Sequence, residues 1–223
     1  MDIELFFQAL AKFVLGLVVV MLLLFIPAGS FHYFNAWLFI GLLFIPMFVV
    51  GLILMFKNPS LLKRRLNAKE KEFEQKKVIL LSGLMFISGF VVAGLNYRYK
   101  WIELSNTIVI IASVLFILSY ILYGEVLREN TFLSRTIEVS KEQKVIDTGL
   151  YGIVRHPMYA ATILLFLTIP LILGSIISFI IFLVYPVIII KRIKNEEEVL
   201  ERELKGYSEY KKKVKYKILP YIW

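Results

Sequence analysis

Five long apolar runs divide the sequence, and they constrain its fold more than any other feature. They cover residues 10–28, 35–56, 78–95, 105–127 and 158–190, and most charged residues lie between them. A helix needs about 20 apolar residues to cross a bilayer, and chain inside lipid must form helices or a closed barrel. The hydrophobic fraction of 59% is far above that of a soluble domain. We therefore expect an all-α polytopic integral membrane protein.

Composition also removes several kinds of chemistry. The sequence has no cysteine and two histidines, so we expect no disulfide, no thiol nucleophile and no metal site. Its net charge of +9 comes from basic residues that lie in the loops between the apolar runs. Anionic lipid and control of topology explain that distribution better than nucleic acid does. Membrane lipid is thus an expected partner, and nucleic acid is not.

The basic loops predict which side of the membrane each loop faces. The first apolar run has no cleavage-like site, so we expect it to remain as a transmembrane helix. The loop at residues 57–77 carries eight lysine and arginine residues, which predicts a cytoplasmic loop and a cytoplasmic N-terminus. Glu70, Glu72 and Glu74 alternate with those cations and suggest a short helix along the surface. The sequence assigns no chemistry to this loop.

The last apolar run, residues 158–190, is too long for one upright span. At about 1.5 Å per residue it would measure roughly 50 Å as a helix, against a hydrocarbon core of about 30 Å. Leu173-Gly174-Ser175 lies near its middle, and both flanks are basic. We expect a helical hairpin with both ends in the cytoplasm, after four transmembrane helices. A single strongly tilted span is the alternative, and it would put the C-terminal tail outside.

The stretch Gly149-Leu-Tyr-Gly-Ile-Val-Arg-His-Pro-Met-Tyr159 leads into that hairpin. Proline suits the first turn of a helix, so Pro157 predicts a helix start with His156 at its flank. His156 and Tyr159 would then lie one turn apart. The alternative is structural: Arg155 and His156 would anchor the helix at the lipid headgroups, and Tyr159 would belong to an aromatic belt.

Beyond the hairpin, the sequence predicts that the helix continues out of the membrane. Arg192 and Glu196 are four residues apart, so they would share one helix face and could point at one site. A solvated ion pair of little energetic consequence is the alternative.

The order of these motifs resembles the isoprenylcysteine carboxyl methyltransferase family, within a wider group of membrane methyltransferases that includes phospholipid methyltransferases. The resemblance rests on the stretch from Thr148 to Tyr159, the Gly-Ser turn, Arg192-x-x-x-Glu196-Glu197, Gly206-Tyr-x-x-Tyr210 and the terminal Ile-Leu-Pro-Tyr-Ile-Trp. It covers roughly residues 130–223, whereas residues 1–125 match only as apolar spans. It divides the chain into N-terminal membrane helices, 1–127, and a methyltransferase-like core, 128–223.

This resemblance implies an enzyme that uses S-adenosyl-L-methionine, bound in a cytoplasmic pocket. Arg192 matches a residue that binds the acceptor, and with Glu196 it forms the expected catalytic pair. Lys217 stands where relatives have arginine, and Ala160-Ala161 stands where they often have glycine. The matched cofactor positions are Gln143, Lys144, Val145, Ile146, Tyr151, His156, Pro157, Met158, Tyr159 and Glu196.

The chemistry of methyl transfer is compatible with these residue types. The reaction is an in-line displacement, which needs alignment and exclusion of water more than proton transfer. A carboxylate acceptor is already nucleophilic at neutral pH, and an arginine can orient it through two hydrogen bonds. A prenylated or other lipophilic carboxylic acid and a phospholipid amine all remain open as acceptors. So do two other classes of protein: an NADPH-dependent sterol-type membrane reductase and a non-catalytic membrane protein.

Overall fold

The computed structural model describes residues 3–67, 73–134, 136, 139–140 and 142–223. Within these ranges the chain is helical and contains no strand, which confirms the all-α expectation. The elements are α1 (Ile3–Ala28), α2 (Phe34–Lys57), α3 (Pro59–Leu66), α4 (Phe73–Tyr99), α5 (Asn106–Glu129), the 3₁₀ turn η1 (Gly149–Gly152), α6 (Pro157–Ile172), α7 (Ile176–Phe182), α8 (Val184–Glu203) and α9 (Tyr207–Lys213).

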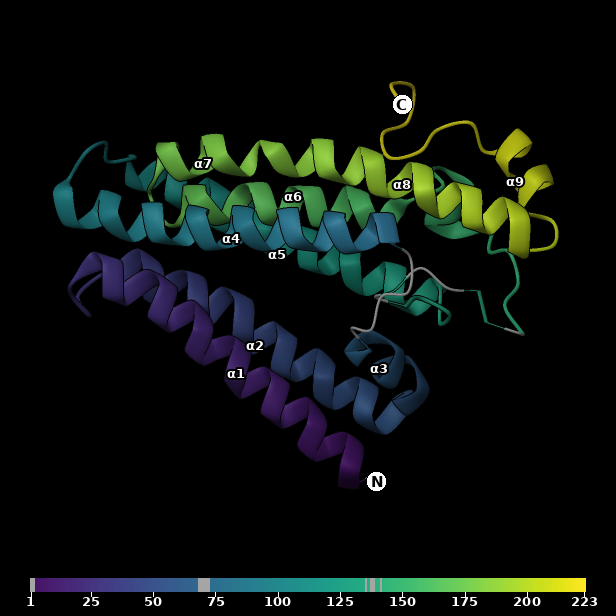
Figure 1. Cartoon of the computed structure of the whole chain (residues 1–223), viewed down its shortest axis with the longest axis horizontal. Helices are drawn as coiled ribbons and strands as arrows, with labels where there is room; N and C mark the ends of the chain where they lie inside the picture. The colour runs from purple at the N-terminus through teal and green to yellow at the C-terminus, as the bar shows by residue number, and fades with distance from the viewer. Residues whose placement is uncertain (1–2, 68–72, 135, 137–138, 141) are drawn as a thin grey trace.

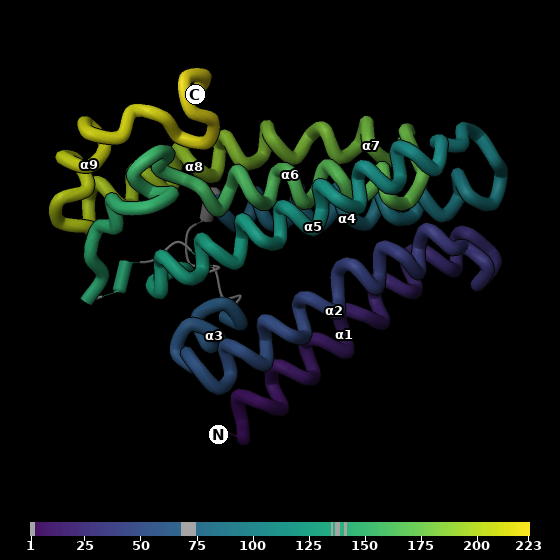
Figure 2. Tube along the Cα trace, turned by 180° about the vertical axis from the view of Figure 1, so that it is seen from behind, coloured from purple at the N-terminus to yellow at the C-terminus, as the bar shows by residue number. Residues whose placement is uncertain are grey.

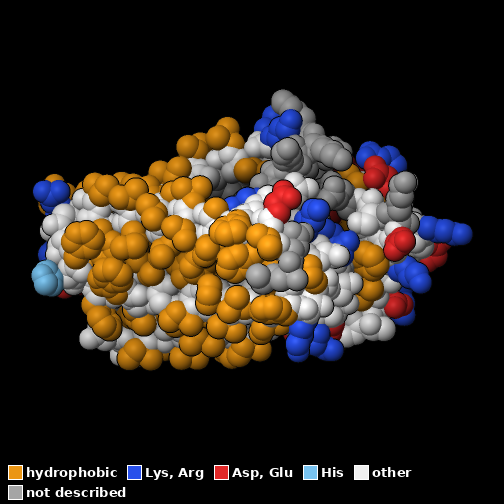
Figure 3. Space-filling view, turned by 90° about the horizontal axis from the view of Figure 1, so that it is seen from below, with side chains coloured by type: hydrophobic (Ala, Val, Ile, Leu, Met, Phe, Trp, Pro, Cys, Tyr) orange, Lys and Arg blue, Asp and Glu red, His pale blue; other side chains and the backbone are white. Residues whose placement is uncertain are grey.

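Five of the described helices are long and apolar enough to cross a membrane. They are α1, α2, α4, α5 and the continuous segment Ile176–Glu203, which joins α7 and α8. Helix α6 has only 16 residues. Figure 3 shows hydrophobic side chains over most of the helical surface on the side in view, with charged side chains gathered towards one end. This surface confirms a multi-pass membrane protein.

Helices α4, α5, α6 and the α7–α8 segment run side by side, whereas α1 and α2 lean away from them (Figures 1 and 2). Helix α1 packs against α4 at one end of the molecule. There, a Cβ atom added at Gly94 would lie 2.6 Å from the carbonyl oxygen of Leu24, so only glycine allows this approach. The close contact at one end lets α1 and α2 diverge from the bundle at the other.

The predicted turn in the last apolar run is present. Helix α6 ends at Ile172, Gly174 has a positive φ of 74°, and Ser175 caps α7 by accepting a hydrogen bond from the amide of Ser178 at 3.2 Å. The chain then returns along α6, so the single tilted span is wrong. Helix α8 continues to Glu203, as the sequence predicts for the exit from the membrane. How many segments fully cross the bilayer stays a prediction.

Both termini lie at the same end of the molecule as α3 and α9, and the α6–α7 turn lies at the opposite end (Figure 1). The position of both termini at one end agrees with the expected topology. Which end faces the cytoplasm stays a prediction. In the basic loop, α3 begins at Pro59 and is capped by Asn58, which accepts from the Leu61 amide at 3.1 Å. The helix expected around Glu70 and Glu72 falls on residues outside the described ranges.

Candidate active site

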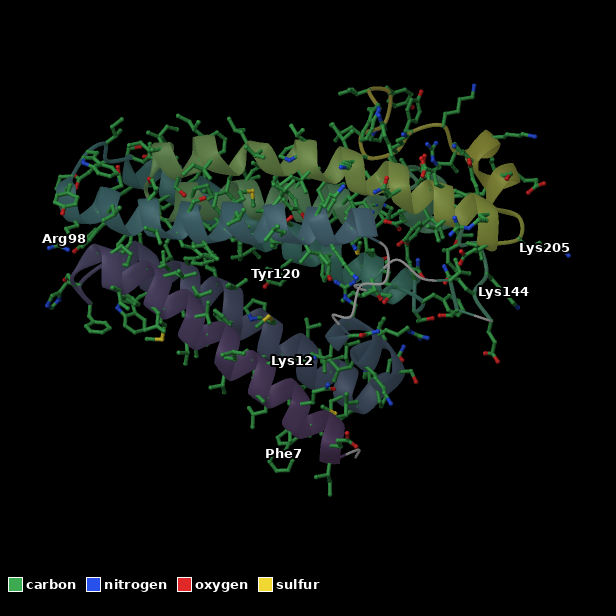
Figure 4. The ribbon with its side chains drawn as sticks, in the orientation of Figure 1. Phe7, Lys12, Arg98, Tyr120, Lys144 and Lys205 are labelled. Atoms are coloured by element: carbon green, nitrogen blue, oxygen red, sulfur yellow. The ribbon has the colours of Figure 1, made fainter. Side chains whose placement is uncertain are left out.

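A cleft lies where α6 begins and α8 leaves the bundle. Ten of the residues predicted to bind cofactor or acceptor line it: Gln143, Lys144, Val145, Ile146, Tyr151, His156, Met158, Tyr159, Arg192 and Glu196. They come from the α5–α6 loop, η1, the first turn of α6 and α8. Figure 4 labels Lys144 at this end of the molecule. The structure thus brings the predicted residues together, and their individual roles stay predictions.

Pro157 is the one predicted residue that does not line the cleft. Its side chain is buried at the first position of α6, where proline's missing N–H leaves no donor unpaired. Pro157 begins the helix, and its expected contact with the cofactor stays a prediction. The preceding backbone is fixed by the tail, because the Arg155 amide donates to the Tyr216 carbonyl at 2.9 Å and the His156 amide to the Lys217 carbonyl at 2.8 Å.

Tyr159 connects the two residues of the predicted catalytic pair. Its hydroxyl donates to Glu196 Oε2 and accepts from Arg192 Nε, the latter at 2.9 Å. Arg192 also donates to Gln75 Oε1, at 3.1 Å, from the start of α4. Arg192 and Glu196 are half-buried and share one face of α8, so the solvated-pair alternative is wrong. Sequence reasoning did not identify Gln75, because nothing in the sequence places the start of α4 beside α8.

A buried charge cluster lies behind the cleft. Arg155 and Glu197 are only 6% and 4% exposed, and Arg155 Nε donates to Glu197 Oε1 at 2.8 Å. His156 Nε2 lies 3.1 Å from the same oxygen. Arg155 Nη1 also donates to the carbonyls of Val214 and Lys215, each at 2.7 Å. These contacts exclude the headgroup-anchor reading of Arg155 and His156, and they show that the cluster holds the tail against α6.

Helix α9 covers the cleft. Tyr207 and Tyr210 are buried and pack with Val145 and Leu200. The Tyr210 hydroxyl donates to the Tyr151 carbonyl at 2.7 Å. Under this cover the cleft holds about 90 Å³. Sites for drug-sized ligands hold roughly 300–1,000 Å³, so the space between the described residues is smaller than such sites.

The residues of the cleft fit a polar, positively charged cofactor. The Tyr207 hydroxyl is buried and has no hydrogen-bond partner among the described residues, which leaves it available to a ligand. Burial raises the pKa of Tyr207, so its phenol stays neutral and can donate. Glu196 supplies the one carboxylate among the described lining residues, and the tyrosines supply aromatic faces for a sulfonium cation.

A second, apolar cavity of about 500 Å³ lies between α1, α2 and α3 on one side and α5 and α6 on the other. Aliphatic and aromatic side chains form most of its wall. Figure 4 labels Tyr120 beside α5 at the boundary with α2, where its hydroxyl donates to the Leu43 carbonyl at 3.0 Å. Ala161, one of the positions where relatives often have glycine, is fully buried and lines this cavity.

The comparisons agree with the resemblance seen in the sequence. The phospholipid methyltransferase family matches residues 105–206, from the start of α5 to just before α9. Residues 105–206 are thus similar to the membrane methyltransferase group. The chain is also 26% identical over 117 residues to the mouse protein Delta(14)-sterol reductase TM7SF2. That similarity covers 47% of this chain and 28% of the reductase, so the chain spans less than a third of that relative's length.

Proposed function

With the match of residues 105–206 to the phospholipid methyltransferase family as premise, we propose that this protein transfers a methyl group from S-adenosyl-L-methionine to a lipophilic acceptor at the membrane. The observation that carries the proposal is that residues far apart in the sequence meet at one cleft. Ten predicted residues from three separate stretches of the chain, residues 143–146, 151–159 and 192–196, line one cleft. An apolar cavity of about 500 Å³ lies near it, which suits a lipophilic acceptor.

The cofactor supplies an electrophilic methyl group on a sulfonium cation. In our proposal, Glu196 accepts hydrogen bonds from the hydroxyl or amino groups of the cofactor, and Tyr151 and Tyr207 present aromatic faces or hydroxyls to it. His156 contributes to the cofactor site indirectly, through Glu197, because its Nε2 is already paired with that carboxylate. Helix α9 excludes water once the cofactor is bound, which favours displacement by the acceptor over hydrolysis.

A carboxylate is the acceptor that Arg192 favours. The guanidinium contacts the Tyr159 hydroxyl and Gln75, and its planar fork can orient a carboxylate through parallel hydrogen bonds. Such an acceptor needs no general base. A phospholipid amine is the second candidate, favoured by the description of the matching family. It would need a proton acceptor, and Glu196 with the Tyr159 hydroxyl could provide one.

The similarity to a sterol reductase gives a third candidate, which uses NADPH. The cleft has no glycine-rich loop for a dinucleotide phosphate among its described lining residues. To separate these candidates, purified protein is incubated with a lipid extract, methyl-labelled cofactor and NADPH, and the labelled product is identified by mass while NADPH is followed by its absorbance. A labelled methyl ester supports the carboxylate, and a labelled N-methyl lipid supports the amine. No labelled lipid, with NADPH consumed instead, would overturn the methyltransferase proposal.

A further inference from the structure

Arg65 lies where the apolar cavity meets the cleft. It is part of α3, in the basic loop to which the sequence assigns no chemistry, and its side chain lines the apolar cavity. Its Nη1 atom donates to the carbonyl of Ser134 at 3.1 Å and lies 3.8 Å from Met158 Sδ. Ser134 and Met158 both line the cleft. Arg65 therefore contacts the walls of both spaces.

None of the residues that the structure describes around Arg65 neutralises its charge. Besides Ser134 and Met158, its partners are the hydroxyl and the ring of Tyr123, whose centroid lies 5.6 Å from the guanidinium carbon. All of these groups are neutral, and no carboxylate in the described part of the chain pairs with Arg65. Arg155, by contrast, is paired with Glu197. A half-buried cation without a counter-ion is costly, and binding an oxyanion removes that cost.

The cavity beside Arg65 indicates what carries the oxyanion. Its wall includes Phe13, Phe48, Met55, Leu127 and Phe166, and a cavity of this kind accommodates hydrocarbon. The other cation in its lining is Lys12, whose Nζ donates to the Leu66 carbonyl at 2.6 Å. A ligand that matches this arrangement has a long apolar chain and an anionic group at its end.

We propose that Arg65 binds the oxyanion of the acceptor while the hydrocarbon chain of the acceptor occupies the apolar cavity. This inference rests on the proposed function and narrows its acceptor to an amphiphile that carries an oxyanion. The oxyanion is either the carboxylate that receives the methyl group or the phosphodiester of a phospholipid. In both cases Arg65 selects for charge, and the cavity selects for chain length.

The first test measures binding without any methyl donor. Detergent-purified full-length protein is titrated with palmitate, with lysophosphatidylethanolamine and with the neutral hexadecanol. We expect Arg65→Gln to weaken binding of at least one of the two oxyanion-bearing ligands about 10-fold or more and to leave hexadecanol unchanged, because only a charged hydrogen bond is lost. Weakening for palmitate identifies a carboxylate, and weakening for the lysophospholipid identifies a phosphodiester. Lys63→Gln removes the same charge from an exposed position of α3 and should change nothing.

Equal binding to the Arg65→Gln and unaltered proteins would overturn the proposal, and so would equal weakening by Lys63→Gln. S-adenosylhomocysteine binding is measured on the same samples and should be unchanged by both variants. If the unaltered protein does not bind S-adenosylhomocysteine, the proposed methyltransferase activity is wrong. The titration with amphiphiles tests Arg65 alone. The two failures can therefore be distinguished.

A second variant tests the cavity if Arg65→Gln does not fold. A Cβ atom added at Gly124 of α5 meets no atom within 4 Å, and Gly124 lines the cavity, so Gly124→Leu extends into open space. Gly83 of α4 also has open space around it but does not line the cavity, which makes Gly83→Leu the matched control. We expect Gly124→Leu to abolish the preference for a 16-carbon over an 8-carbon acid. Retention of that preference would contradict the assignment of the cavity.

Discussion

His156 Nε2 lies 3.1 Å from Glu197 Oε1, so the first turn of α6 is bound to the exit helix α8 within a buried charge cluster. Arg155 shares the same carboxylate oxygen at 2.8 Å and holds the backbone of the tail. The cluster thus joins the three parts of the chain that surround the cleft. Its integrity should determine whether the cleft forms at all.

We expect Glu197→Gln to destabilise the protein by about 3–5 kcal/mol, the range for breaking a buried ion pair by removal of one partner. The reason is that Arg155 would remain buried without its counter-ion. Thermal unfolding in detergent measures the loss. Glu198→Gln, an exposed neighbour on α8, is the control and should have little effect. Equal stability of the two variants would show that the cluster does not hold the tail.

Arg192→Lys tests whether Arg192 binds the methyl acceptor or the methyl donor. Lysine keeps the charge but loses the planar fork that can orient a carboxylate, so turnover should fall while S-adenosylhomocysteine binds nearly as before. Steady-state kinetics and equilibrium binding measure the two effects. Lys194→Arg, at an exposed position on the same helix, should alter neither. If Arg192→Lys abolishes cofactor binding, Arg192 belongs to the donor site.

The dependence of rate on pH should identify the acceptor. Burial raises the pKa of Tyr151, Tyr207 and Tyr210, so these phenols stay protonated above their usual value of about 10. The native state holds these protons more tightly than the unfolded chain does, so the cover is stable below about pH 10 and loses stability above it.

With a carboxylate acceptor, the rate should be flat between about pH 7.5 and 9.5. An amine acceptor would instead give a rate that rises with pH as the amine loses its proton.

The topology can be tested with single cysteines, since the chain has none of its own. Cysteines at Lys63 in α3 and at Lys212 in α9 should react with an impermeant reagent from the same side of the membrane. A cysteine at Lys100, at the opposite end of the molecule, should react from the other side. Labelling of the cysteines at positions 63 and 212 from opposite sides would contradict the placement of α3 and α9 on one side of the membrane.

The apolar runs and the Gly174 turn could be read from the sequence, because span length and a left-handed glycine are local properties. The shared face of Arg192 and Glu196 could be read for the same reason, since helix periodicity fixes it. The contacts of Arg192 and Glu196 could not be predicted from the sequence. Tyr159 bonds with both, and Gln75 reaches Arg192 from 117 positions away in the chain. The partners of Arg155 and Arg65 depend on how helices pack, so a pattern of single residues could not pair Arg155 with Glu197 or bring Arg65 to Met158.

The most direct test of the central claim is equilibrium binding of S-adenosylhomocysteine and of NADPH to the purified protein. We expect S-adenosylhomocysteine to bind and NADPH not to bind. Glu196→Gln should weaken S-adenosylhomocysteine by about 1–3 kcal/mol, the range for leaving a polar partner unpaired, and Glu198→Gln should not. Binding of NADPH without S-adenosylhomocysteine would contradict the account, and full S-adenosylhomocysteine affinity in Glu196→Gln would remove Glu196 from the cofactor site.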